Sequence, residues 1–296
     1  MLEDMFKISR ICLRLIRIAS LEDELDVDVK DPERMIEEIR HNKEMRADIF
    51  TFIQRIPDLK PRYRYHMEWE SIAALDYRDH HHWFNELIDF RCRNKVRKGE
   101  KKGVVIRVAD FNDDFIRGIE NIYNESPVRQ GRRFPHYGKS FEEVKAANST
   151  HLDRSDFIGA YYHGELIGFI KLVYGDRTAR TEQIISKLGH RDKAPTNALV
   201  SKAVELCEER KVPFIIYGVW SQGSLGEFKQ SSGFRKVDLP RFYVPMNIKG
   251  KIAIQSGLYK GLKKRIPDKI RDEIIRIRTK WHRNRPGPEK KMPPQN

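Results

Sequence analysis

The stretch that decides the fold is a polar loop, His190-Arg191-Asp192-Lys193-Ala194-Pro195-Thr196-Asn197, followed by an amphipathic run over residues 198–210. Such a run predicts a helix that begins at the end of the loop. Free N–H groups in the first turn of a helix attract negative charge, and Arg191 and Lys193 add two cations to them. The loop is therefore a candidate binding site for a pyrophosphate or a carboxylate.

Apolar and β-branched runs surround this loop. Residues 157–162 and 166–173 are joined by His163-Gly164-Glu165, which predicts a hairpin. Residues 178–186 predict a strand ahead of the loop, and Pro213-Phe214-Ile215-Ile216-Tyr217-Gly218-Val219 predicts a short buried strand after the helix. Because one helix connects these last two strands, we expect them to be parallel neighbours that splay apart at one end.

A turn, a short helix over residues 223–231 and a last strand over 241–245 complete the segment. This order resembles the acyltransferase fold of the GNAT superfamily, and Leu225-Gly226-Glu227-Phe228-Lys229-Gln230-Ser231-Ser232-Gly233-Phe234 matches its late helix and closing Gly-Phe. Within that superfamily the chain is most similar to the Fem-like branch, whose members transfer aminoacyl or acyl groups onto amines of cell-wall precursors. The Phe228-Lys229 pair, the missing glycine-rich phosphate loop and the basic lead-in over residues 93–104 carry this resemblance. It implies an α/β fold with a mixed sheet.

Two features of the chain depart from the pattern of the superfamily, and both concern the acyl donor. Relatives that use coenzyme A carry Gln/Arg-x-x-Gly-x-Gly/Ala at the loop, whereas this chain has no glycine after Gly189, so close approach to a pyrophosphate is not guaranteed. The tyrosine that those relatives place in the late helix is replaced by Lys229. The resemblance thus leaves acyl-coenzyme A and aminoacyl-tRNA as alternative donors. It implies no metal, and three adjacent histidines, His80-His81-His82, cannot face one ion from a regular helix or strand.

The resemblance implies two catalytic side chains. Lys229 would place an ammonium near the carbonyl oxygen that becomes negative during attack by an amine. Glu182, midway along its predicted strand, would be the general base that removes a proton from the acceptor amine. The alternatives are a surface lysine and an exposed glutamate paired with an arginine. We also predict a donor-binding set: Ser186, Lys187, Arg191, Lys193, Thr196, Asn197, Ala198 and Phe228.

A long loop, residues 125–138, separates helical patterns at 111–124 and 141–148 and is rich in arginine and aromatic residues. Guanidinium groups suit the phosphates and carboxylates of a nucleotide-linked or peptide acceptor. We therefore predict an acceptor-binding set: Arg129, Arg132, Arg133, His136, Tyr137 and Tyr217. The alternative is a solvated basic loop.

The rest of the chain suggests four parts: an N-terminal helical and α+β region (1–98), the GNAT-like domain (99–247), a basic helical tail (248–285) and a disordered end (286–296). In the first part, residues 1–55 suggest helices, 63–75 a strand pair or a strand and turn, and 83–98 one amphipathic helix. Asp31-Pro32 is a helix start signal, with Asp as cap and Pro at the first helical position.

The net charge of +14 is concentrated in the tail, where residues 249–296 hold fifteen basic and four acidic residues. An apolar stripe with lysines and arginines between, as in residues 249–285, suits a helix on an anionic membrane surface. The same cations suit tRNA phosphates, and a third alternative is that the stripe packs on the protein. Three scattered cysteines fit a reducing cytoplasm, and no run of the sequence is apolar enough to span a membrane.

The resemblance implies an N-acyltransferase, and the composition predicts that it is cytoplasmic, and peripheral on the inner membrane face if the tail binds lipid. An amine acceptor would attack an activated acyl group directly, since no cysteine or serine has the neighbours of a nucleophile. The alternative is a binding module of the same fold that has lost catalysis and docks to the membrane or to a cell-envelope enzyme.

Overall fold

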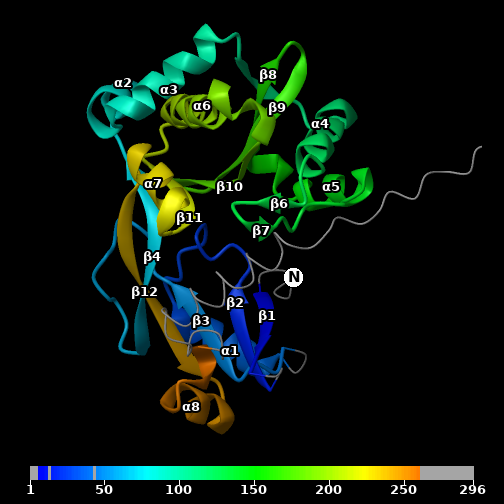
Figure 1. Cartoon of the computed structure of the whole chain (residues 1–296). Helices are drawn as coiled ribbons and strands as arrows, with labels where there is room; N and C mark the ends of the chain where they lie inside the picture. Colours follow the sequence, from blue (N-terminus) through cyan, green and yellow to red (C-terminus); the bar gives the residue numbers. More distant parts are fainter. Residues whose placement is uncertain (1–5, 13–14, 43–44, 261–296) are drawn as a thin grey trace, which may run out of the picture.

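The computed structural model describes residues 6–12, 15–42 and 45–260, and in them ten strands form one mixed sheet (Figure 1). The strands lie in the order β1-β2-β3-β12-β4-β11-β10-β9-β8-β5. Their bounds are β1 Phe6–Ile11, β2 Ile16–Leu21, β3 Ile49–Ile53, β4 His66–Asp76, β5 Val105–Ala109, β8 Ser155–Tyr162, β9 Glu165–Tyr174, β10 Thr178–Ser186, β11 Phe214–Val219 and β12 Arg235–Pro245. The α/β class and the mixed sheet are as predicted.

Helices cover the β5–β11 part of this sheet on both faces (Figure 1). One face packs against α4 (Asp113–Tyr123) and α5 (Phe141–Asn148) through a cluster centred on Phe115, Phe157 and Phe169. The other face packs against α3 (Phe90–Lys101) and α6 (Pro195–Glu209). Between α4 and α5, β6 (Val128–Arg129) and β7 (Arg132–Arg133) form a small second sheet.

The predicted hairpin and the parallel pair are confirmed. β8 and β9 pair antiparallel, and β10 and β11 pair parallel, with α6 as the connection. Only three pairs join β10 to β11: Thr178↔Phe214, Ala179↔Ile215 and Arg180↔Ile216. Beyond them β10 stays on β9 as far as Ser186, whereas β11 stays on β4. The predicted splay between the two strands therefore exists, and it opens after Arg180 and Ile216.

The helical prediction for residues 1–55 is wrong. These residues form β1, β2 and β3, and the only helix described there is α1 (Pro32–His41). The runs are rich in isoleucine and phenylalanine, which favour strands, and the charged positions of β1 are exposed at the edge of the sheet. The start of α1 is as predicted, because the Asp31 side chain accepts a hydrogen bond from Arg34 N and Pro32 follows it.

Of the two alternatives predicted for residues 63–75, the structure has one long strand, β4, and not a strand pair. β4 lies between β12 and β11 and pairs antiparallel with both. The helix predicted at 83–98 is broken: a short helix α2 (His80–His82) and a π-helical turn (Trp83–Leu87) precede α3. The break comes from Trp83, fully buried with Nε1 donating to Ser232 O, and from Asp89, which caps α3. Since β4 joins both halves of the sheet, the proposed division at 98/99 crosses one continuous sheet.

Late in the chain, α7 (Gly223–Ser231) is as predicted, and α8 (Ile248–Gln255) begins the tail. Short 3-10 turns lie at Leu152–Arg154, Leu188–Lys193 and Leu258–Lys260. Ala253 and Tyr259 are buried against Ile16, Ile18 and Ile49 of β2 and β3. Tyr259 also donates a hydrogen bond to Glu68 Oε1 at 2.6 Å. The start of the tail therefore packs on the protein.

The rest of the predicted helical tail and the predicted disordered end lie outside the described residues. Among the helices that are described, none combines the length and the apolar character needed to cross a bilayer.

Candidate active site

Lys229 lies on α7 and directs its ammonium toward the end of β11. The residue is 3% exposed, so the surface-lysine alternative is wrong. Nζ donates to Val219 O at 2.7 Å and to Ser221 Oγ at 3.3 Å, and lies 4.6 Å from the centre of the Tyr217 ring. Within the described residues no carboxylate forms an ion pair with it. Burial lowers the pKa of Lys229 to about 8.

Tyr217 and Phe228 form the apolar wall beside this ammonium. The Tyr217 ring lies edge-on to Phe228, 6.4 Å between centroids, and to Phe234 at 5.6 Å. Burial raises the pKa of Tyr217 well above its usual value, which keeps the phenol neutral. The structure thus places Tyr217, which was predicted to bind the acceptor, next to Phe228, which was predicted to bind the donor.

Glu182 lies on β10 just after its last pair with β11. Its Oε2 is 2.7 Å from Lys171 Nζ, and its Oε1 is 3.6 Å from Arg180 Nη1. Lys171, on β9, is 1% exposed and also donates to the carbonyl and hydroxyl oxygens of Thr150. The side chain of Glu182 is 26% exposed. It is therefore anchored by a buried cation and still open to solvent.

A β-bulge between Thr181 and Gln183 explains this orientation. Strand alternation would send Glu182 and Gln183 to opposite faces, but the bulge interrupts the register with β9. The hydroxyl of Tyr123, on α4, donates to Gln183 Oε1, and Lys171 stacks beside Phe157 on that same α4–α5 face. Glu182 thus faces α4 and α5, whereas Lys229 and Tyr217 pack on the α3–α6 face. The two predicted catalytic residues flank the splay from opposite faces of the sheet.

The predicted donor loop forms a 3-10 helix, Leu188–Lys193, and the first turn of α6. Ser186 Oγ and Thr196 Oγ1 are hydrogen-bonded to each other at 2.9 Å. Asn197 is buried and donates from Nδ2 to Cys92 Sγ at 3.4 Å, and Ala198 is buried beside Gly99 of α3. The structure brings these residues together but turns the Asn197 amide inward, away from a donor on the surface of the loop.

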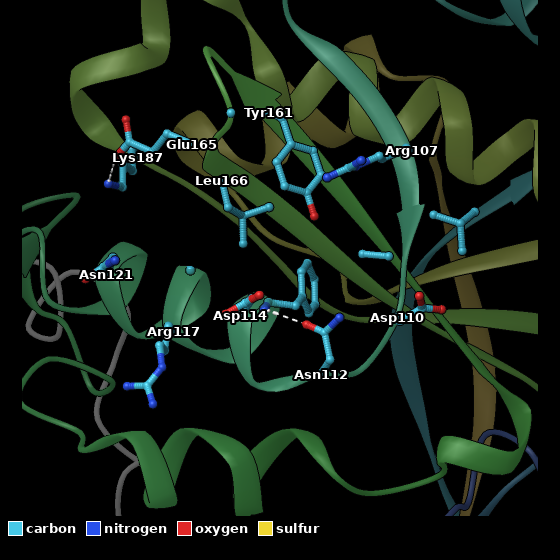
Figure 2. A pocket seen from close by; sticks show the side chains of 15 residues that line it. Arg107, Asp110, Asn112, Asp114, Arg117, Asn121, Tyr161, Glu165, Leu166 and Lys187 are labelled. Atoms are coloured by element: carbon cyan, nitrogen blue, oxygen red, sulfur yellow. Dashed lines mark hydrogen bonds and ion pairs between the residues drawn. The ribbon is translucent and has the colours of Figure 1, made fainter.

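The cations of the loop have different environments. Lys187 forms an ion pair with Glu165 (Figure 2). Lys193 Nζ lies 4.5 Å from the centre of the Tyr162 ring and 3.3 Å from Asp192 Oδ1. Arg191 is exposed on the 3-10 helix.

Within the predicted acceptor loop, Arg129 is set apart from the other arginines. Its guanidinium donates to Ser186 O at 2.6 Å, to Ile122 O at 2.7 Å and to Glu125 Oε2 at 3.1 Å, so it fixes the loop. Arg132 and Arg133 are exposed on β7 and its turn.

The two ring residues of this loop differ in exposure. His136 stacks 4.6 Å from Tyr123, and burial, with smaller contributions from Lys139 and Arg129, lowers its pKa. Tyr137 is 46% exposed.

A groove of about 550 Å³ lies between α4 and the β5–β8 edge of the sheet (Figure 2). Arg107, its guanidinium 4.2 Å from the Tyr161 ring centre, lines it together with Asp114 and Arg117. Lys187 is the only predicted site residue in its lining, and neither Lys229 nor Glu182 contributes to it. The groove is therefore separate from the splay. No cluster of metal-ligating side chains occurs in the part of the chain that the structure describes.

Three features of the site escaped the sequence analysis. Lys171 is marked only by being the one charge in the apolar run 166–173. Arg180 and Arg154 form ion pairs with Asp23 and Asp26, which tie the N-terminal region to the splay. Glu125 accepts hydrogen bonds from the N–H groups of Leu188 and Gly189. The last two features depend on contacts between distant segments, which no local pattern indicates.

The fold is shared with solved structures that include FemX, a protein of the Fem-like branch, as the resemblance predicted. The structure of FemX matches with a TM-score of 0.60 at 10% identity, covering 84% of this chain and 85% of that chain. A C-terminal domain of a putative lysylphosphatidylglycerol synthetase from Agrobacterium fabrum matches with a TM-score of 0.54 at 11% identity, covering 87% and 88%.

L-PGS from Bacillus licheniformis matches with a TM-score of 0.51 at 13% identity, covering 82% of this chain and 81% of that chain. No protein-family model and no curated protein sequence matches the chain significantly. At these identities the likeness shows the fold.

Proposed function

We propose that this protein is an N-acyltransferase in which an amine acceptor directly attacks an activated acyl group in a ternary complex. The observation that carries the proposal is the splay between β10 and β11, with a buried ammonium on one face and an anchored carboxylate on the other. In this proposal the donor binds on the Lys229 side of the splay and the acceptor on the Glu182 side. The shared fold with FemX and a putative lysylphosphatidylglycerol synthetase supports this class of reaction.

In this proposal Lys229 stabilises the negative charge that forms on the carbonyl oxygen during attack. A pKa of about 8 keeps the side chain mostly protonated at neutral pH. Burial strengthens the effect of the ammonium, because little water screens it. Its hydrogen bonds to Val219 O and Ser221 Oγ hold it at the end of β11, beyond the last pair of β11 with β10.

Glu182 accepts the proton of the attacking amine. An ammonium has no free electron pair, so a base must act before or during attack. Lys171 and Arg180 hold the carboxylate in place, and the partly exposed side chain remains accessible from the α4–α5 face. Arg132, Arg133, His136 and Tyr137 lie in the loop beside α4 and α5, and we assign them to the acceptor.

The acceptor in this proposal is an amine of a cell-envelope or nucleotide-linked precursor, and the donor is an acyl-coenzyme A or an aminoacyl-tRNA. The residues of the donor set line the strand end and loop between β10 and α6, with Phe228 at the splay. A peripheral position on the inner membrane face, mediated by residues beyond α8, would keep the enzyme close to a lipid-carried acceptor. The alternative of a silent binding module would gain support from a disordered loop at 191–197, but this segment is helical.

The test is a transfer assay with the purified chain, using labelled acyl-coenzyme A and aminoacyl-tRNA with a panel of amine acceptors. We expect an amide product that requires both substrates and that the Lys229→Ala variant forms far more slowly. Thermal shifts with each donor identify the donor class independently of turnover. If neither donor binds and no amide forms, the binding-module alternative replaces the proposal.

A further inference from the structure

The carboxylate of Glu125 accepts hydrogen bonds from the main-chain N–H groups of Leu188 and Gly189, just after the end of β10. Leu188 N donates to Oε2 at 2.6 Å, and Gly189 N donates to Oε1 at 2.9 Å. Two consecutive N–H groups that point at one anion form a main-chain nest, the arrangement by which loops bind phosphate groups. Here a side chain of the same protein, from the loop that follows α4, is the anion.

Arg129 forms an ion pair with the same carboxylate. Its Nη2 lies 3.1 Å from Glu125 Oε2, and its Nη1 donates to Ser186 O at 2.6 Å. The side chains of Arg129 and Glu125 are only 12% and 22% exposed. Burial lowers the pKa of Arg129 despite the neighbouring Glu125, and Arg191 contributes to the lowering, which places a second cation close by. Without Glu125, the two N–H donors and the Arg129 guanidinium would have no anion.

Other donors at this strand end also have partners within the chain. Ser186 and Thr196 are hydrogen-bonded to each other, and Lys187 is paired with Glu165 (Figure 2). At the start of α6, Pro195 has no N–H, and Asn197 N donates to Ala194 O. These donors of the segment predicted to bind a phosphate are therefore already bonded within the chain.

We propose that Glu125 is a specificity determinant that takes the place of a donor phosphate and excludes pyrophosphate-bearing donors, such as coenzyme A thioesters, from this loop. That an acyl donor binds here rests on the proposed function, whereas the hydrogen bonds of Glu125 to the two N–H groups are seen in the structure itself. A bound pyrophosphate would have to break two hydrogen bonds and an ion pair before reaching the N–H groups. The accepted donor is then one that brings its acyl group to the splay without a phosphate at Leu188 and Gly189.

The experiment compares the binding of inorganic pyrophosphate and coenzyme A to three full-length proteins by calorimetry. Glu125→Ala empties the nest. Glu142→Ala, at an exposed position of α5, makes the same change of net charge and leaves the nest filled. We expect Glu125→Ala to bind both ligands at least about tenfold more tightly than the wild type, since charge-assisted contacts replace an internal one, and Glu142→Ala to match the wild type. Equal affinity in the wild type and Glu125→Ala, or an equal gain in Glu142→Ala, would overturn the proposal.

A second measurement uses the wild type alone and does not depend on how the variants fold. The Gly189 amide resonance should remain unchanged during titration with pyrophosphate, because its N–H stays bound to Glu125. Movement of that resonance at ligand concentrations that saturate binding would show that phosphate displaces Glu125, and the proposal would be wrong. Both experiments measure binding, so a failure of acyl transfer with every donor would count against the proposed function and leave this inference standing.

Discussion

At the splay, the two faces of the sheet carry opposite charges, and these charges have different environments. On the α7 side, Lys229 is a buried cation whose partners are a carbonyl, a hydroxyl and an aromatic ring. On the α4 side, Glu182 is a partly exposed carboxylate held by Lys171 and Arg180. The cation lacks a neutralising partner within the described residues, so its protonation changes near neutral pH. The carboxylate is instead fixed in position. The buried ammonium of Lys229 suits stabilisation of the negative charge that forms in the reaction. The fixed carboxylate of Glu182 suits removal of a proton from a positioned amine.

The largest effect should come from removing the ammonium. We predict that Lys229→Ala lowers kcat about 10²- to 10³-fold with little change in KM, because the ammonium acts on the transition state more than on bound substrate. Steady-state kinetics of amide formation will test this, with the exposed Lys236→Ala as a control. Unchanged kcat with a raised KM would mean that Lys229 only binds substrate.

Removing the base should have the next largest effect. Glu182→Gln keeps the shape of the side chain, and we predict a loss of about 10²-fold in kcat at neutral pH, within the range for general bases. Raising the pH should restore part of the rate, because more of the acceptor amine is then already deprotonated. A variant that keeps full activity at pH 7 would remove Glu182 from the mechanism.

The burial of Lys229 should also affect stability. The pKa of about 8 in the folded chain lies below the ordinary value of about 10.4. Between these values the unfolded chain binds more protons, so the free energy of unfolding of the wild type should rise with pH. We therefore predict that Lys229→Met is more stable than the wild type below pH 8, and that its advantage shrinks above pH 8. Urea denaturation at several pH values will measure this, and a difference independent of pH would contradict the shifted pKa.

The smallest effect on the fold should come from truncation after Lys260. The start of the tail packs through Ala253 and Tyr259, so it has to be kept. We predict that deleting residues 261–296 changes the free energy of unfolding by less than about 0.5 kcal/mol and abolishes binding to anionic vesicles. Vesicle sedimentation at low salt tests this. If the full-length protein ignores anionic vesicles, the membrane interpretation of the tail is wrong.

The elements that the sequence predicts well are those with strong local patterns. The β8–β9 hairpin, β10, α6, β11 and α7 combine regular hydrophobic spacing with clear turns, and the single crossover helix dictates the parallel pair. β1 and β2 were missed because they are short and carry charged residues, and β3 because the strand it pairs with, β12, lies almost 200 residues away.

The site was predictable only in part, for the same reason. Lys229 follows from its place before Gly233-Phe234, but its burial depends on how α7 packs on Tyr217. The Lys171–Glu182 pair requires the register of β9 and a bulge, which alternation alone predicts incorrectly. The contact of Glu125 with Leu188 and Gly189 joins segments more than 60 residues apart and has no local signal.

The most direct test of the central claim is the pH dependence of the single-turnover rate of acyl transfer in the wild type and in Lys229→Ala. If the ammonium of Lys229 acts in the chemical step, the wild-type rate should fall as the pH rises through about 8, because deprotonation removes the charge. That falling limb should be missing from the slower Lys229→Ala profile. A limb that persists in the variant, or a wild-type rate that only rises through pH 8, would contradict the account.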